Sequence, residues 1–349
     1  MSLAPFEPID FDALHSIAEG QSVVGLIAAG LEQVSDTSIG RMQARPFLVD
    51  SLIAEKGNKE MNKFINELFG LLADGGVSAV LIKGQGVAQC YQRPLWRSAG
   101  DVDLLLDADN YEKAKDLLLP RATKVDKEGV VSKHQGMMLD GFEVELHGTF
   151  RSVTKRMNTV LDDIQKGVNC RGDIRLWDND GTDIPLPSAD ADAVFIFTHI
   201  VTHFYKGGIG LRQICDWCRL LWTCRDVIDR PLLQSRLVSA GLVNEWKVFG
   251  AFAVDNLGVP VDAMPFYEVT PSIQRKVARL QAFIIKAGNF GHNRDMSYYR
   301  KYPYVIRKAI SASQRIGDGL SHMRIFPQNS ARITVRSLVG GTRAAMRGE

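Results

Sequence analysis

Hydrophobic residues near the start of the chain recur at the spacing of an α-helix. The clearest run follows Asn58 and ends before Gly75 and Gly76. Asparagine is favoured at a helix N-cap and glycine just after a C-terminus, so we expect this helix to begin after Asn58 and to stop at Gly75. One apolar face then packs against a core. The members of this face are Met61, Phe64, Ile65, Leu68, Leu71 and Leu72.

After residue 76 the pattern changes to short apolar runs. Residues 77–83 and 101–107 read as strands, and each precedes a helical stretch. Residues 134–139 and 142–147 flank Asp140-Gly141, a dipeptide favoured in two-residue hairpin turns because both positions accept positive φ. These elements predict a small α/β unit built on a mixed sheet.

Helical spacing returns after residue 185. Ser188 can cap a helix that carries Asp190 and Asp192 in its first turn, where acidic side chains interact favourably with the helix dipole. Residues 206–210 end this helix, and residues 211–222 predict a second one. The predicted fold is therefore α+β in class. It comprises an N-terminal helical segment (1–76), a small mixed-sheet α/β core (77–185) and a C-terminal helical domain (186–349).

The composition is that of a globular protein, because 45% of the 349 residues are hydrophobic and 23% are charged. The start of the chain lacks a basic stretch followed by an apolar run, and no stretch approaches the roughly 18 apolar residues of a membrane span. The five cysteines are an odd number without a secretory signal, which favours reduced thiols over a disulfide framework. We therefore expect a cytoplasmic protein without a transmembrane segment.

Basic residues are concentrated at the C-terminal end. From Phe290 onward there are eleven basic residues and three acidic ones, although the whole chain has a formal charge of only +2. Such a segment can bind an anionic partner, either a phosphate-rich molecule or an acidic membrane surface. The alternative is a solvated helical face that docks on the acidic remainder of the same chain. The basic residues are Arg294, Arg300, Lys301, Arg307, Lys308, Arg315, Arg324, Arg332, Arg336, Arg343 and Arg347.

Two carboxylates lie on one face of the strand predicted at residues 101–107. Side chains alternate along a strand, so Asp101 and Asp103 point one way while the apolar residues between and after them point toward the core. The same alternation puts Glu145 on the polar face of a later strand, with Glu143 at its periphery. Three convergent carboxylates suit Mg²⁺, and two bridged ions can promote nucleotidyl transfer. An isolated Asp-x-Asp can also be a solvated strand edge.

A strand-to-helix turn precedes the two aspartates in the chain. In the run Lys83-Gly84-Gln85-Gly86, the glycines allow backbone amides to approach a phosphate, and the lysine adds positive charge beside a helix N-terminus. The motif is short, and an ordinary strand-to-helix turn is the alternative.

The order of these motifs resembles that of the polymerase-beta-like nucleotidyltransferases. The run Leu81-Ile82-Lys83-Gly84 is followed by a short helix, by residues 97–105 (RSAGDVDLL), by another helix and by Val144-Glu145-Leu146-His147. The succession resembles more closely an uncharacterised bacterial nucleotidyltransferase family that reads LKG…R…GDiDLLv…a…L…vdlH. The resemblance is strongest over residues 78–150 and extends weakly through residues 199–222.

This resemblance implies an enzyme that uses Mg²⁺ or Mn²⁺ to move a nucleoside monophosphate from an NTP, such as ATP, to an acceptor hydroxyl. Many members of the superfamily have Gly-Ser where this chain has Gly84-Gln85, so the grip on the triphosphate differs here. The glutamate at 145 stands where others have aspartate and keeps the carboxylate. The implied catalytic and metal-binding residues are Asp101, Asp103 and Glu145, and the implied nucleotide-binding residues are Lys83, Gly84, Gln85, Gly86 and Arg97.

Polar residues recur at helical spacing on the two helices after the core. His199 and His203 share one face of the first helix, and Arg212 and Asp216 share one face of the second. If the helices are neighbours, these side chains form one polar surface over the cleft, which we predict to bind the acceptor. The alternative is an ordinary salt-linked exposed face. His147 either contributes to acceptor binding or is a structural histidine.

Other metal or redox sites in this region have little support in the sequence. The pair His199 and His203 lacks the glutamate of an HExxH motif and a third ligand. Cys215 and Cys218 lie in the middle of an apolar helix without a second CxxC, which favours a packing role.

The sequence leaves the acceptor open among a small molecule, a saccharide, a protein and RNA. Two alternative functions also remain. The first is a catalytically inactive nucleotide-binding or interaction protein, motivated by Gln85. The second is a toxin-like nucleotidyltransferase that modifies RNA, motivated by the basic C-terminal segment.

Overall fold

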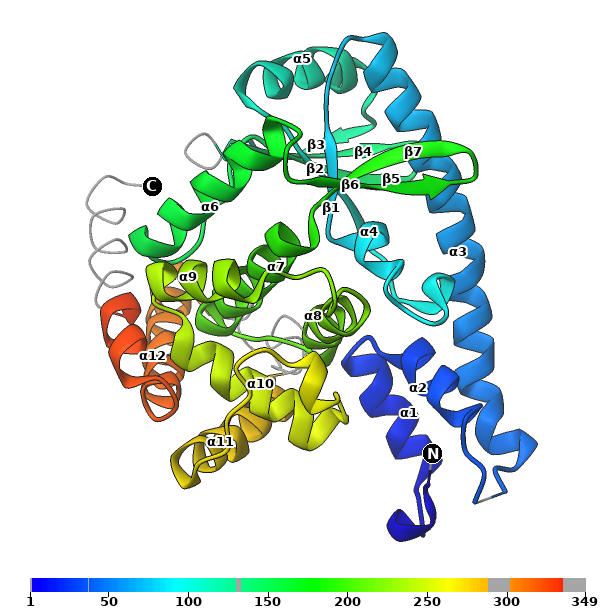
Figure 1. Cartoon of the computed structure of the whole chain (residues 1–349), viewed down its shortest axis with the longest axis vertical. Coiled ribbons are helices and arrows are strands. Elements are labelled where there is room, and N and C mark those ends of the chain that lie inside the picture. Colours follow the sequence, from blue (N-terminus) through cyan, green and yellow to red (C-terminus); the bar gives the residue numbers. More distant parts are fainter. Residues whose placement is uncertain (1, 37, 130–132, 288–301, 335–349) are drawn as a thin grey trace.

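The computed structural model describes residues 2–36, 38–129, 133–287 and 302–334. A mixed sheet is flanked by a long N-terminal helix on one side and by a group of C-terminal helices on the other (Figure 1). The α+β class predicted from the sequence is confirmed. Much of the basic C-terminal segment predicted to bind an anionic partner lies outside the described residues.

The sheet has the strand order β1-β2-β5-β4-β3. β2 is antiparallel to β1 and parallel to β5, and β4 and β5 form the predicted hairpin. Both residues of the Asp140-Gly141 turn have positive φ, at 49° and 87°. The strands of the sheet are β1 (Val80–Ile82), β2 (Asp101–Leu105), β3 (Lys124–Val125), β4 (His134–Leu139) and β5 (Phe142–His147), and a separate hairpin is formed by β6 (Ile174–Asn179) and β7 (Thr182–Pro187).

The N-terminal helices are α1 (Phe11–Gly20), α2 (Val24–Leu31) and α3 (Arg41–Asp74). α3 ends before Gly75, as predicted, but the predicted N-cap at Asn58 is wrong. Asn58 lies in the middle of α3 and is buried, and its side-chain amide donates hydrogen bonds to the carbonyls of Leu95 and Arg97 at 2.7 and 2.8 Å. These long-range acceptors satisfy a polar side chain inside a helix, at a position where local preference would have started the helix.

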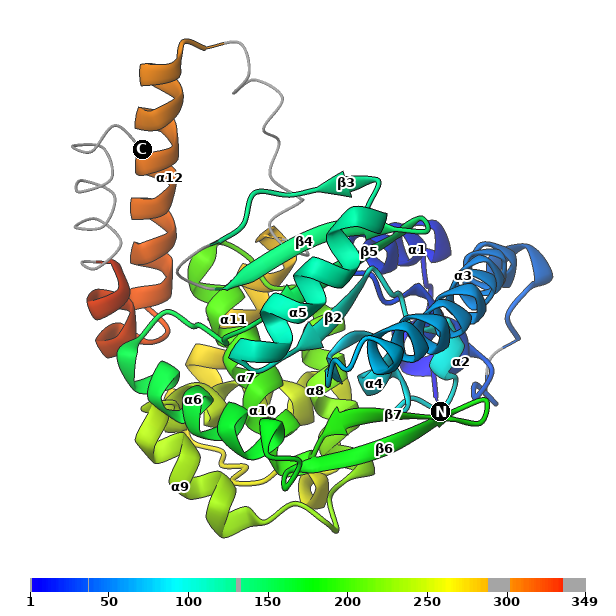
Figure 2. The same ribbon diagram turned by 90° about the horizontal axis from the view of Figure 1, so that it is seen from above.

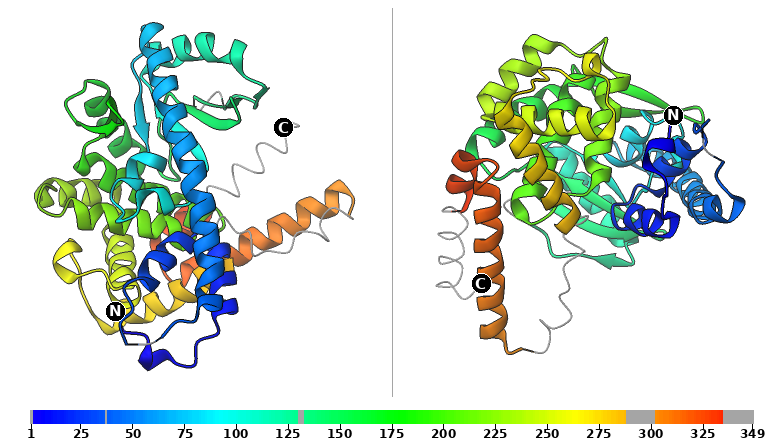
Figure 3. Two further views of the ribbon diagram at one scale, coloured as in Figure 1. Left: turned by 90° about the vertical axis from the view of Figure 1, so that its right-hand side faces the viewer. Right: turned by 90° about the horizontal axis from the view of Figure 1, so that it is seen from below.

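The remaining helices surround the sheet and build the C-terminal part of the molecule. Ser188 caps α7 as predicted, because its side chain accepts a hydrogen bond from the backbone N–H of Ala191. Figure 2 and Figure 3 show that one end of α12 extends away from the rest of the molecule. The helices are α4 (Gly84–Ala88), α5 (Ala108–Leu118), α6 (Lys155–Asn169), α7 (Ala189–Lys206), α8 (Leu211–Thr223), α9 (Arg230–Ala240), α10 (Val243–Leu257), α11 (Pro271–Ala287) and α12 (Tyr304–Met323).

Alternate residues of the central strands point into two different cores. Leu81 and Leu104 pack with the apolar face of α3, whereas Ile82 and Leu105 belong to the core that the C-terminal helices build around Trp217. Because side chains alternate along β2, Asp101 and Asp103 lie on the same side of the strand as Leu105. The polar face of β2 is therefore turned toward the C-terminal helices. Within the described ranges, no helix combines the length and the apolar character needed to cross a membrane.

Candidate active site

Three carboxylates converge where the parallel strands β2 and β5 lie side by side. Asp103 is in register with Glu145, and Asp101 is in register with Glu143. Ligand oxygens of Asp101, Asp103 and Glu145 all lie within 4.8 Å of one another. The structure therefore brings together the three carboxylates that the sequence predicted, while Glu143 is exposed at the periphery.

Asp103 is the most buried of the three, with 1% of its surface exposed. One carboxylate oxygen, Oδ1, accepts hydrogen bonds from Lys83 Nζ at 2.7 Å and lies 2.6 Å from His147 Nε2. Burial raises the pKa of Asp103, but Lys83 and the His147 hydrogen bond outweigh burial and leave the pKa below its ordinary value. The other oxygen, Oδ2, is buried without a hydrogen-bond partner among the described residues.

The pKa values of Asp101 and Glu145 are shifted in opposite directions. The neighbouring charge of Asp103, together with burial, raises the pKa of Asp101. Hydrogen bonds from His134 and His147 hold the pKa of Glu145 well below its usual range, since both Nε2 atoms lie near Glu145 Oε2 at 3.1 and 3.3 Å. The cluster thus contains three carboxylates, one lysine and two imidazoles. A divalent cation would relieve the repulsion that remains between the carboxylates.

His134 is a site residue that sequence reasoning missed. It lies on β4 directly opposite His147 on β5, and the two rings are 4.8 Å apart between centroids. The signal was present, because counting outward from the Asp140-Gly141 turn pairs residue 134 with residue 147. A hairpin register therefore identifies the second histidine once the turn is recognised.

Lys83 occupies an unusual backbone conformation at the end of β1. Its φ is 56°, and the following Gly84 has φ of 33° and lies against the backbone carbonyl of Asp101. Such a conformation is costly for a residue with a side chain, and it occurs here where the ammonium group meets Asp103. The predicted strand-to-helix turn therefore directs Lys83 into the carboxylate cluster.

Gln85 and Gly86 face away from this cluster, although the sequence grouped them with the nucleotide-binding residues. The side-chain amide of Gln85 is buried and donates hydrogen bonds to Asn58 and Asn62 on α3, at 3.2 and 2.7 Å. Gly86 lies against Leu186 of β7, where a Cβ atom would approach to 2.7 Å. Close packing between α4 and its neighbours explains why small or amide residues stand at these positions.

Arg97 and Asp216 form a buried bidentate ion pair that the sequence did not predict. Arg97 Nε and Nη2 donate to the two carboxylate oxygens of Asp216, each at 2.7 Å. The hydroxyl of Tyr91 donates to the same carboxylate at 2.8 Å. Both partners were assigned to substrate binding from the sequence, but their charged groups bind each other and join the loop before β2 to α8.

Arg212 lies beside this pair and retains unused donors. Its Nη1 donates to the carbonyl of Ser98 at 3.1 Å, but its buried Nε has no hydrogen-bond partner among the described residues. Burial and the neighbouring Arg97 lower the pKa of Arg212, although a guanidinium stays protonated in proteins. A cavity of about 240 Å³ lies in front of it. The charged and polar residues lining this first pocket are Lys83, Arg97, Asp101, Asp103, Glu145, His199, His203, Arg212, Gln213 and Asp216.

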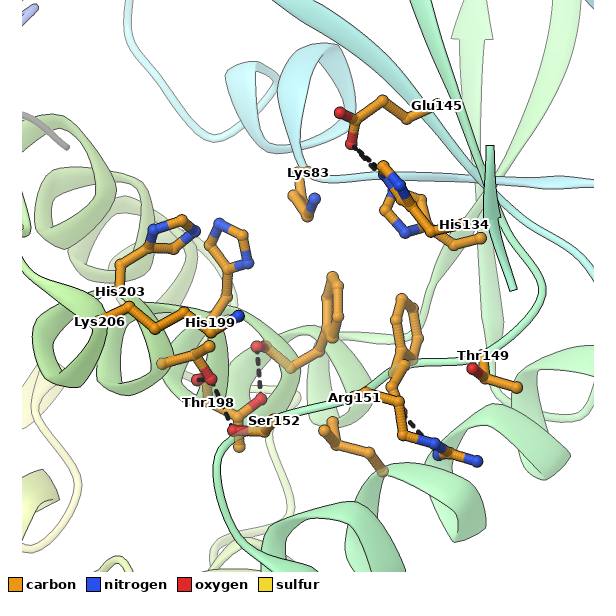
Figure 4. A pocket seen from close by; sticks show the side chains of 15 residues that line it. Lys83, His134, Glu145, Thr149, Arg151, Ser152, Thr198, His199, His203 and Lys206 are labelled. Carbon is orange, nitrogen blue, oxygen red and sulfur yellow. Dashed lines mark hydrogen bonds and ion pairs between the residues drawn. The ribbon is translucent and has the colours of Figure 1, made fainter. Parts of the chain in front are cut away.

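A second pocket, of about 290 Å³, adjoins the same cluster, and Lys83, Glu145, His199 and His203 line both pockets. Figure 4 shows His199, His203 and Lys206 on one side of it, across from Glu145 and His134. Burial, followed by the nearby charge of Lys83, lowers the pKa of His199 well below its ordinary value and that of His203 to about 4. Both imidazoles are therefore neutral at physiological pH.

Among the described residues, the groups of potential metal ligands include neither His199 nor His203. Cys215 and Cys218 are buried in the helical core, in agreement with the predicted packing role.

The carboxylate cluster fits a divalent metal ion. Asp101, Asp103 and Glu145 supply hard oxygen ligands within reach of one another, and no donor of the described residues reaches the buried Oδ2 of Asp103. A second group, His134, Glu145 and His147, shares Glu145 with the first. Acidic clusters of this kind could bind metal in the functional protein.

A family model described as an uncharacterised nucleotidyltransferase matches residues 7–251. The match includes α1 to α9 and most of α10, and therefore covers both pockets and the carboxylate cluster. No curated protein and no solved structure matches the chain.

Proposed function

The chain belongs to this nucleotidyltransferase family, and on that basis we propose that it transfers a nucleoside monophosphate from an NTP to an acceptor hydroxyl and releases pyrophosphate. The observation that carries the proposal is the convergence of Asp101, Asp103 and Glu145 on adjacent parallel strands, with a buried carboxylate oxygen left unpaired. Magnesium or manganese is the expected ion, because carboxylate oxygens and water are the ligands that these ions prefer.

The three carboxylates hold the metal in this proposal, and the bound ion supplies charge stabilisation at the transferring phosphate. Lys83 and His147 orient Asp103 through its Oδ1 atom, which leaves Oδ2 available for the ion. His134 and His147 keep Glu145 ionised. These contacts fix the ligand set before substrate binds, which reduces the reorganisation needed for catalysis.

The triphosphate binds in the first pocket. This placement is supported by the positively charged side chains that line the pocket, Lys83 beside Gly84 at the end of β1 and Arg212 on α8. The Nε of Arg212 has no acceptor among the described residues and can donate to a phosphate. Arg97 acts through position rather than through a phosphate contact, because its Nε and Nη2 donate to Asp216 and its Nη1 donates to the carbonyl of Ser98. Gln85 and Gly86 contribute through the packing of α4.

The experiment is incubation with each labelled NTP, Mg²⁺ or Mn²⁺ and a cell extract, followed by identification of the labelled product. Asp101→Asn, Asp103→Asn and Glu145→Gln should each reduce labelling by at least about a hundredfold, because each removes a charged ligand from the site. Glu143→Gln is the matched control on the same strand. Undiminished metal-dependent transfer in the Asp101→Asn/Asp103→Asn double variant would refute the proposed mechanism.

A further inference from the structure

The second pocket is lined by a polar stripe on the C-terminal half of α7. On α7, the run Thr198-His199-Ile200-Val201-Thr202-His203-Phe204-Tyr205-Lys206 repeats the pair Thr-His after four residues and places a lysine one turn later. Residues at this spacing share one face of a helix, and all five polar ones line the pocket. The opposite face, with Ile200, Val201 and Phe204 fully buried, packs in the core. The polar face of this part of α7 therefore faces the cavity.

The basic side chains that line this pocket are not all paired with acids of the described residues. Lys83 pairs with Asp103, and Arg151 at the rim pairs with Asp162. Lys206 also lines the pocket, but no carboxylate of the described residues forms an ion pair with it. Within the described ranges, the Lys206 ammonium group therefore has no acidic partner and can bind an anion.

Hydrogen-bonding groups near the carboxylate cluster are also available. His199 stacks edge-on against His203, with ring centroids 4.3 Å apart, and has no hydrogen-bond partner within the described part of the chain. Its neutral ring can accept a hydrogen bond from a hydroxyl group. Thr202 Oγ1 donates to the carbonyl of Thr198 and lies 2.5 Å from Ser152 Oγ, so these hydroxyls are fixed in position.

The size of the pocket limits what it can hold. Its volume of about 290 Å³ is at the lower end of the range of small-molecule sites, about 300–1,000 Å³. This suits a small molecule or a terminal group of that size better than a nucleic-acid duplex or a protein surface.

Resting on the proposed function, we propose that this pocket binds the acceptor as a small hydroxylated molecule with an anionic group, a phosphate or a carboxylate. Lys206 binds the anionic group, and His199 accepts a hydrogen bond from the hydroxyl that reacts. Because Lys83, Glu145, His199 and His203 line both pockets, the hydroxyl meets the NTP at their junction.

The reaction balances at that junction. The acceptor oxygen forms a bond to the α-phosphorus of the NTP, and the bond from that phosphorus to the pyrophosphate oxygen breaks. His199 holds the hydroxyl through its hydrogen bond, the hydroxyl proton is released to solvent as the new bond forms, and pyrophosphate leaves with the bonding electron pair.

The test measures two kinds of binding to the full chain by calorimetry. A non-hydrolysable NTP analogue with Mg²⁺ reports on the first pocket. Glycerol 3-phosphate, glycerol and inorganic phosphate, each added to the protein saturated with that analogue, report on the second. We expect glycerol 3-phosphate to bind at least about tenfold more tightly than glycerol, the effect of one charge-assisted contact.

Lys206→Met should remove most of this preference, weakening binding of glycerol 3-phosphate and of inorganic phosphate by about tenfold, whereas Lys206→Arg should keep it. The affinity for the NTP analogue should stay within about twofold in each variant. Lys166→Met is the matched control, since Lys166 is likewise an exposed lysine in the last turn of a helix but lines neither pocket.

The outcomes separate this inference from the proposed function. Equal binding of glycerol and glycerol 3-phosphate, or an unchanged preference in Lys206→Met, overturns the inference. If Lys206→Met weakens binding of the NTP analogue as much as binding of glycerol 3-phosphate, the inference is also overturned, because the second pocket would then hold the triphosphate. A protein that binds no NTP analogue refutes the proposed function, and Lys206-dependent binding of glycerol 3-phosphate in its absence still supports an anion-binding pocket.

Discussion

At the scale of single residues, the site combines contacts that are local in the chain with contacts between distant segments. Asp101 and Asp103 share a face of their strand because side chains alternate along a strand, so residues two positions apart point the same way. The pairing of Arg97 with Asp216 spans 119 positions and depends on how α8 packs against the loop before β2. Local patterns contain no information on such a contact, so both residues were assigned to substrate instead.

The Arg97–Asp216 pair gives a prediction for stability. Asp216→Ala leaves a buried guanidinium without its counter-charge, and we expect a loss of about 3–5 kcal/mol in the free energy of unfolding. Replacing both partners, as in Arg97→Met/Asp216→Leu, should recover much of that loss because no buried charge is left unpaired. Urea unfolding of Asp216→Ala and of the double variant with its two constituents, Arg97→Met and Asp216→Leu, measures the loss and the coupling.

Activity provides a second measurement on the same variants. The pair fixes the loop that leads into Asp101, so the double variant should be stable and yet slow in nucleotidyl transfer. A double variant no more stable than Asp216→Ala would contradict the argument from unpaired charge.

At the scale of elements, the hairpin and the helix stripe of α7 follow from the sequence, whereas the length of α3 does not. The Asp140-Gly141 turn sets the register of β4 and β5, and Ser188 starts α7 where its side chain predicts. α3 continues through Asn58 because the carbonyls of Leu95 and Arg97, distant in sequence, satisfy its amide. Tertiary hydrogen bonds here override a local capping preference.

The histidine pair of α7 predicts a pH-dependent stability. Burial lowers the pKa of His203 to about 4 in the folded protein, against about 6.5 in the unfolded chain. The unfolded state therefore binds more protons in that range, and the stability that the neutral ring contributes above pH 6.5 is lost as the pH falls toward 4. Allowing for partial exposure of the side chain, we expect about 1–3 kcal/mol from this residue.

Urea unfolding at pH 7.5 and pH 4.5 measures this effect in the wild type and in His203→Gln. The variant should lose less stability between the two pH values than the wild type, because its side chain does not titrate. The same pH dependence in both proteins would show that His203 is protonated equally in the folded and unfolded states.

At the scale of the whole molecule, the site lies between two cores that the sequence could not place relative to each other. The sheet residues Asp101, Asp103 and Glu145 form one wall, and α7 and α8 form the other. Alternate side chains of β1 and β2 pack into the two different cores. Because the same strands contribute to both cores, they join the two walls. Each wall was recognisable in the sequence, but their approach depends on long-range packing.

This arrangement predicts that metal and nucleotide stabilise different parts of the molecule. In the proposed site, Mg²⁺ alone would contact only the sheet wall, so it should slow amide hydrogen exchange in β2 and β5. An NTP analogue with Mg²⁺ would also contact Arg212 and should extend the protection to α8. Arg212→Met should weaken analogue binding by about tenfold or more and abolish the added protection of α8, while metal protection of β2 stays.

Arg225→Met, an arginine beyond the end of α8 and outside both pockets, is the control. If α8 is still protected in Arg212→Met, the triphosphate contacts the C-terminal helices through another residue. If Mg²⁺ alone protects α8, the two walls close on the metal before the nucleotide binds.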